Sequence, residues 1–154
     1  YIHTFDVVGE MLHLVNKYDI PIKLLELEIT ETTDSEGVSD VVQKMKDAGF
    51  TMLMDDFGSG YSSLNMLQKT QFDVLKIDRG FLSEFMESSR GRKIISHTIS
   101  MSRDIGLDII AEGVETPEQA SFLSDCGCDS AQGFYYSKPI TQEEFDKMLV
   151  EVNK

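Results

Sequence analysis

The sequence predicts an α/β protein in which about five strands, each paired with a helix, form one parallel sheet. Strand-like and helix-like stretches alternate along the 154 residues, as in parallel sheets with crossover helices. Charged and amide residues also gather near the C-terminal ends of the strand-like stretches. The alternation alone fits either an open doubly wound sheet or part of an eight-stranded barrel of about 250 residues. The strand-end groups favour the barrel, because barrels collect functional residues from several strand ends.

Five stretches have the composition of strands. They are Leu24–Thr30, Phe50–Asp56, Phe72–Asp78, Leu107–Glu112 and Cys128–Tyr135. In the first, apolar residues alternate with Glu26, Glu28 and Thr30. Alternate residues of a strand face opposite sides, so we expect the apolar side to meet the helices and the carboxylates to point to the interior. Lys76 of the third strand is expected to point inward as well.

Helices are predicted around and between these strands. The first lies near Thr4–Tyr18, where apolar residues recur with helical spacing. A second spans about Ser35–Ala48, and the long connection Gly80–Ile105 is expected to hold one main helix. Two more begin at Thr116 and Thr141, each of which has Gln or Glu three residues later. The expected apolar face of the last helix comprises Phe145, Met148, Leu149 and Val152.

Composition indicates a single globular domain over residues 1–154, with 41% hydrophobic residues. The net charge of −13 disfavours electrostatic binding to DNA, RNA or an anionic membrane. No apolar stretch reaches the roughly 20 residues of a membrane helix. Cys126 and Cys128 are too few for a disulfide framework or a zinc site, which fits a cytoplasmic location. Because the chain opens on Tyr1, we expect natural sequence upstream of it.

Each predicted strand becomes polar near its C-terminal end. The residues concerned are Glu28, Glu31, Asp55, Asp56, Lys76, Asp78, Glu112, Glu115 and Gln132. Converging carboxylates form a hard oxygen-rich site that suits Mg²⁺ or Mn²⁺. Consecutive side chains of a strand diverge, so Asp55 and Asp56 are suited to serve two metals a few ångströms apart, as in phosphodiester hydrolysis. Phosphoryl chemistry is therefore the leading hypothesis.

Plainer explanations exist for each residue taken singly. An acidic residue at the end of a strand is usually solvated, and Asp55–Gly58 has the composition of an ordinary turn. The three histidines, His3, His13 and His97, are dispersed, which favours surface or packing roles. The methionines are expected to fill the core. The joint pattern at the strand ends is what favours a site.

Several of these segments resemble one known family. They are Leu27–Thr32 (LEITET), Asp55–Leu64 (DDFGSGYSSL), Leu75–Asp78 (LKID), Ala111–Thr116 (AEGVET) and Gln132–Pro139 (QGFYYSKP). In this order they resemble the EAL domain of bacterial cyclic-di-GMP phosphodiesterases. The resemblance implies a (β/α)8 TIM-type barrel, here incomplete. It also implies hydrolysis of one bond of cyclic-di-GMP, to linear pGpG, with two Mg²⁺ or Mn²⁺ ions.

The resemblance also implies roles for single residues. The metal ligands would be Glu28, Asp55, Asp56 and Glu112. Lys76 would hold or help activate the attacking water, and Gln132 would orient water or substrate. Glu31 and Glu115 look like the family's supporting carboxylates, and Phe57–Ser63 is its mobile loop linking metal binding to dimer contacts.

The chain departs from the family at its start, where the Glu-Ala-Leu motif and a metal-binding Asn have no counterpart. About 90–100 residues of a standard barrel are absent. The partial barrel should therefore have two open edges, which favours a homodimer, strand exchange or aggregation. Fewer oxygen ligands should weaken metal binding, so we expect this chain alone to be inactive. The alternative is a degenerate domain that acts as a cyclic-di-GMP sensor or protein-interaction module; other domains of the parent protein would set any membrane tether.

Overall fold

The computed structural model describes residues 6–30, 37–59 and 63–152. Its strands are β1 (Glu26–Thr30), β2 (Thr51–Phe57), β3 (Val74–Ile77), β4 (Asp108–Ala111) and β5 (Ser130–Ala131). They form one sheet in the order β1-β2-β3-β4-β5, and every neighbouring pair is parallel. The predicted α/β class and parallel pairing are therefore confirmed. In the described part of the chain β1 and β5 form the two edges of the sheet, as expected for an incomplete barrel.

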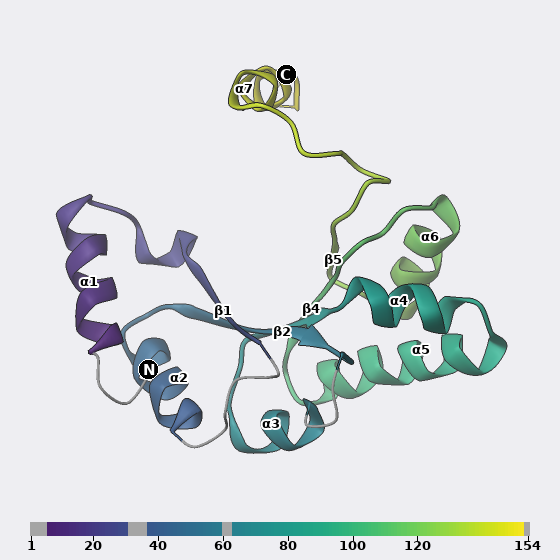
Figure 1. Ribbon diagram of the computed structural model, residues 1–154, viewed down its shortest axis with the longest axis horizontal. Coiled ribbons are helices and arrows are strands. Elements are labelled where there is room, and N and C mark those ends of the chain that lie inside the picture. Colours follow the sequence, from purple (N-terminus) through teal and green to yellow (C-terminus); the bar gives the residue numbers. More distant parts are fainter. Residues whose placement is uncertain (1–5, 31–36, 60–62, 153–154) are drawn as a thin grey trace.

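Helices precede the first strand, connect the strands and follow the last one. They are α1 (Val7–Lys17), α2 (Val38–Asp47), α3 (Ser63–Lys69), α4 (Arg79–Met86), α5 (Ser89–Asp104), α6 (Pro117–Cys126) and α7 (Gln142–Val152), with a short 3-10 helix at Ile22–Leu24. Helices α1 to α6 surround the sheet in an arc, whereas α7 stands apart at the end of an extended segment (Figure 1). Both predicted threonine caps precede their helices, since α6 follows Thr116 and α7 follows Thr141.

Two element predictions were wrong. The connection after β3 holds two helices rather than one, because Ser88 caps a new helix by accepting a hydrogen bond from the amide of Gly91. The chain is so tight here that a Cβ on Gly91 would lie 2.0 Å from the carbonyl oxygen of Phe85. The last strand has only two residues, because Gly133 begins a turn directly after it. Helix α3 was not predicted.

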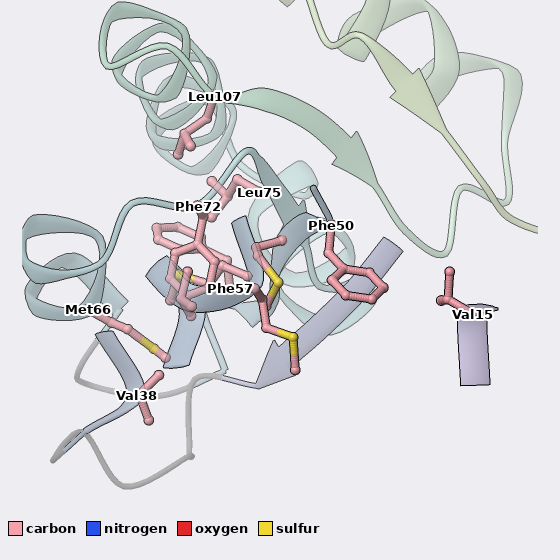
Figure 2. Packing of buried hydrophobic residues seen from close by; sticks show 12 residues of the cluster. Val15, Val38, Phe50, Phe57, Met66, Phe72, Leu75 and Leu107 are labelled. Carbon is pink, nitrogen blue, oxygen red and sulfur yellow. The ribbon is translucent and has the colours of Figure 1, made fainter. Parts of the chain in front are cut away.

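The core lies between the sheet and its helices in two clusters. The first joins α1, α2 and α3 to the first three strands, and Figure 2 shows it with Val15, Val38, Phe50, Phe57, Met66, Phe72, Leu75 and Leu107 labelled. The second packs α4, α5 and α6 on β3 and β4. Met52 and Met54 are almost fully buried in the first cluster, which confirms the prediction that they fill the core. Burial of such side chains contributes about 1.5–3 kcal/mol each.

The N-terminal ends of the strands are held by aspartates that bind backbone amides. Asp73, just before β3, accepts a hydrogen bond of 2.9 Å from the amide of Met52, and its other oxygen lies 2.7 Å from Lys46 Nζ. Asp129 accepts from the amide of Ile109 in the same way, at 2.9 Å. These bonds fix the strand register at one end of the sheet. The strand-end residues of the predicted site lie at the opposite end.

The predicted apolar face of helix α7 is largely uncovered in the structure. Phe145, Met148 and Leu149 are each more than two-fifths exposed. Val152, the fourth residue of that face, belongs to the helix but its side chain lies outside the described part. As to membranes, every helix of the described ranges is too short or too polar to cross one.

Candidate active site

Parallel pairing brings the C-terminal ends of the strands together. Thr30 of β1 pairs with Asp55 of β2. Lys76 of β3 pairs with Ile110 of β4, which is two residues before Glu112. The backbone amide of Glu112 donates to the carbonyl of Ile77, and that of Gln132 donates to Ala111. Residues at the C-terminal ends of all five strands of the described sheet therefore meet at one end of that sheet.

Lys76 lies at the centre of this group. Its ammonium is 2.6 Å from Glu28 Oε1, 2.9 Å from Asp55 Oδ1 and 2.8 Å from Glu112 Oε1. The lysine side chain is 8% exposed, whereas Glu28 is 45% exposed because it stands on the open edge strand. Carboxylates from three strands thus meet at one cation. The expected inward orientation of Glu28 and Lys76 agrees with this geometry.

The surroundings of Lys76 keep it charged. Burial by itself lowers the pKa of a lysine, because it penalises the ammonium. Contacts with Glu112, Glu28 and Asp55 outweigh that effect and raise the pKa of Lys76 well above its ordinary value. Lys76 is therefore a permanent cation at physiological pH. In this charge state Lys76 donates hydrogen bonds and supplies a positive charge within the cluster.

A bulge at the end of β2 shapes the Asp55-Asp56 pair. The register between β2 and β3 shifts between Met54 and Phe57, and Asp56 has a left-handed backbone with φ of 58°. Burial, followed by the charges of Asp55 and Asp78, raises the pKa of Asp56. Asp56 is therefore electrostatically part of the same cluster. The bulge explains how two consecutive residues contribute to one site.

The carboxylates fit a divalent cation by charge and by ligand chemistry. Four of them, Glu28, Asp55, Asp56 and Glu112, stand near one ammonium, which leaves an excess of negative charge. Within the described ranges, the buried Oδ1 of Asp55 has no hydrogen-bond partner. Its contact with Lys76 is short enough for a strong ion pair but misses hydrogen-bond angles. Such an oxygen retains capacity for a cation.

The carboxylates are not arranged as a finished metal site. In the part of the chain that the structure describes, no three acidic, cysteine or histidine side chains have metal-binding proximity. The ammonium of Lys76 takes the position between the three strands instead.

The remaining predicted residues are distributed around this centre. Gln132 Nε2 donates to Glu112 Oε1 at 2.6 Å, so Gln132 joins the cluster. Glu115 lies on the loop between β4 and α6, where it forms an ion pair with Arg79 at 2.7 Å. Glu31 is outside the described residues, and so are residues 60–62 of the predicted loop. Of the histidines, His13 lies on α1 and His97 on α5, away from the cluster, and His3 is outside the described ranges.

Two neighbours were not given a role from the sequence. Asp78 caps α4 by accepting from the amides of Gly80 and Phe81, and it also acts on the charge of Asp56. An aspartate directly before a helix is a recognisable capping signal. Arg79 has no such local signal, because its partner Glu115 is distant in the sequence.

The chain is similar to known proteins in sequence and in fold. Residues 2–139 match the EAL domain family. The cyclic di-GMP phosphodiesterase NbdA of Pseudomonas aeruginosa is 33% identical over 93% of this chain, which covers 19% of NbdA. The EAL domain of Mycobacterium smegmatis DcpA superposes with a TM-score of 0.87 at 34% identity, covering 96% of this chain and 68% of that one.

A third protein was solved with metal and nucleotide. The manganese and cyclic-di-GMP complex of Klebsiella pneumoniae BlrP1 superposes with a TM-score of 0.81 at 30% identity, over 90% of this chain and 36% of that one. These structural neighbours have TIM-barrel-like EAL domains, which confirms the predicted fold class. The chain spans about one fifth of the length of curated relatives such as NbdA. It belongs to the EAL domain family.

Proposed function

We propose that residues 1–154 are one partial EAL domain from an enzyme that hydrolyses cyclic-di-GMP to linear pGpG. The observation that carries the proposal is the contact of one buried ammonium with carboxylates from three strands, at 2.6–2.9 Å. Relatives named as cyclic di-GMP phosphodiesterases support the same reaction. The net charge of −13 argues against DNA or RNA as a substrate.

Glu28, Asp55, Asp56 and Glu112 would hold two Mg²⁺ or Mn²⁺ ions. The ions would supply an activated water and stabilise charge on the phosphoryl oxygens. The excess carboxylate charge supports this assignment, and the manganese complex of BlrP1 is consistent with it. Without bound cations, the anionic substrate would be repelled by the acidic cluster.

The other residues would act on water and phosphate. Lys76, held as a cation, would donate to the attacking water or to a phosphoryl oxygen, where negative charge develops. Gln132 would restrict Glu112 through their 2.6 Å hydrogen bond and orient water or substrate nearby. Glu31 and Glu115 are proposed as supporting carboxylates. Glu115 would act through its loop, because it pairs with Arg79 rather than with Lys76.

The test is a hydrolysis assay on the natural full-length protein with cyclic-di-GMP and Mn²⁺, with the nucleotide products separated by chromatography. We expect pGpG to accumulate, and EDTA to stop it. The chain of residues 1–154 assayed in parallel is expected to be inactive, since part of the ligand set would be upstream. Intact cyclic-di-GMP after incubation with the full-length protein would rule out the enzyme.

A binding role without catalysis is the second candidate. It is favoured by the position of Lys76, whose ammonium stands where three carboxylates converge and already neutralises part of their charge. In that case calorimetry would detect cyclic-di-GMP binding to the full-length protein with no pGpG formed in the presence of Mn²⁺. Formation of pGpG would exclude this candidate.

We also propose that the chain forms a homodimer through the outer strands β1 and β5, by strand pairing or by strand exchange. Both strands are short, and in the described sheet each pairs with one neighbouring strand only, a position that favours pairing with another chain. Light scattering coupled to size exclusion would measure the mass, and a monomer at all concentrations would contradict the proposal. A cytoplasmic location stays a prediction, consistent with the two free cysteines.

A further inference from the structure

Arg79 makes two contacts with the loop that follows β4. It is the first residue of α4, three residues after Lys76 in the same segment. Its guanidinium lies 2.7 Å from Glu115 Oε1. Its aliphatic stem covers Gly113 so closely that a Cβ there would lie 2.2 Å from Arg79 Cγ. Gly113 has a φ of 65°, so the loop both turns and approaches Arg79 at this glycine.

The opposite side of the same loop is held by the segment after β5. Val114, which is fully buried, donates its amide to the carbonyl of Gln132 and accepts from the amide of Tyr135. Gly133 packs against the backbone of Val114 with no room for a side chain. The loop is therefore clamped between Arg79 and the residues around Gln132.

Two ion pairs connect the segment Lys76–Arg79 to the loop after β4, one on each side of Gly113. Lys76 contacts Glu112 at 2.8 Å, and Arg79 contacts Glu115 at 2.7 Å. Rotation of the loop that moved Glu115 would also move Glu112, because only two residues separate them. Glu112 in turn bonds Gln132. The Arg79–Glu115 pair therefore restrains the same loop that carries Glu112, in addition to the direct contacts of Glu112 with Lys76 and Gln132.

We infer that Arg79 is a positioning residue that fixes Glu112 through Glu115, an inference that rests on the proposed function. An exposed ion pair contributes little to folding stability, and Arg79 and Glu115 are 62% and 43% exposed. Residues that orient ligands, in contrast, typically change metal affinity or activity about 10–100-fold when replaced. The effect of Arg79 should therefore appear in metal binding and turnover rather than in stability.

The variants separate the guanidinium from the stem. Arg79→Met keeps a stem over Gly113 and removes the ion pair, whereas Arg79→Lys keeps a cation. Arg92→Met is the control for loss of an exposed ion pair, because Arg92 pairs with Glu118 at the start of α6; it also removes the hydrogen bond that Arg92 Nε donates to the Met86 carbonyl. Each is made in the full-length protein and measured for Mn²⁺ affinity by calorimetry, for kcat and KM, and for amide exchange over residues 112–116.

Arg79→Met should lower Mn²⁺ affinity and kcat about tenfold, with KM nearly unchanged, and should speed amide exchange over residues 112–116. Arg79→Lys should recover most of the loss, and Arg92→Met should match the wild type. Combining Arg79→Met with Glu115→Gln should add little to either change alone. The inference is overturned if Arg79→Met behaves like Arg92→Met in Mn²⁺ affinity and exchange, or if its effect adds fully to that of Glu115→Gln. A wild type that hydrolyses nothing defeats the proposed function alone, because amide exchange still tests Arg79.

Discussion

At the scale of single residues, the cluster depends on the charge of Lys76. Lys76→Met would leave Glu28, Asp55 and Glu112 without their shared cation. Breaking a buried ion pair by removing one partner costs about 3 kcal/mol, and losing a preorganised donor lowers kcat about 100-fold or more. Urea unfolding and steady-state kinetics of the full-length protein would measure both. A variant with wild-type stability and turnover would contradict the central role of this ammonium.

The same residue predicts how stability changes with pH. The folded-state pKa of Lys76 is raised above its value in the unfolded chain, so its contribution is fully present below the ordinary lysine pKa of about 10.4. It is lost as the pH rises through the higher folded-state pKa. We therefore expect the stability difference between wild type and Lys76→Met to be constant from pH 6 to 9 and to shrink only in strong alkali. Urea unfolding at several pH values would show a loss near neutrality if this sign were wrong.

Asp56 combines an uncommon backbone with an unfavourable charge. Its φ of 58° is readily adopted by glycine, and its raised pKa means that ionisation in the folded protein costs stability as the pH rises above the ordinary aspartate range. Asp56→Gly should therefore unfold at a higher temperature in EDTA at pH 7, by the equivalent of about 1 kcal/mol, while losing Mn²⁺ affinity. Asp56→Asn, which keeps the side-chain size, should remove the charge cost and retain the strain. A destabilised Asp56→Gly variant would show that the position carries no strain.

At the scale of elements, Asp73 joins three segments at the N-terminal end of the sheet. It binds the Met52 amide and Lys46, and its own amide donates to the carbonyl of Met52. Asp73→Ala leaves a part-buried N–H without its partner, so we expect a loss of about 1–2 kcal/mol in urea unfolding. Asp108→Ala, at an exposed position of β4, is the control and should change stability little. Equal effects of the two substitutions would mean that the hydrogen bond from the Met52 amide to Asp73 contributes little to stability.

The helices and strands also show how much of the fold local sequence patterns predict. The ends of the first four strands agree with the predicted ends to within two residues, because apolar runs bounded by turns are strong local signals. Helix α3 has only seven residues and its Leu64 is largely exposed, so its pattern is weak. The break before α5 depends on the Ser88 cap and on the close approach of Gly91 to the Phe85 backbone. The capping residue itself is neither Gly nor Pro, so the break has no strong local signal in the sequence. For the site, alternation placed Glu28 and Lys76 on the inner face, whereas the Arg79–Glu115 pair depends on tertiary packing.

At the scale of the whole molecule, α7 differs from the six helices around the sheet. It stands apart from them (Figure 1). Its residues Phe145, Met148 and Leu149 are largely exposed. An isolated helix of this length is marginal in water, so its amides in residues 1–154 should exchange with solvent far faster than those of β3, which is buried throughout. Phe145→Gln with Met148→Gln should reduce association through this exposed face, which is separate from the homodimer proposed through β1 and β5. The unfolding temperature should not fall, since these side chains support little of the core. Glu143→Gln with Glu151→Gln is the matched control on the same helix. Light scattering and hydrogen exchange measure the two quantities, and slow exchange in α7 of a monomeric chain would mean that the helix packs on the sheet after all.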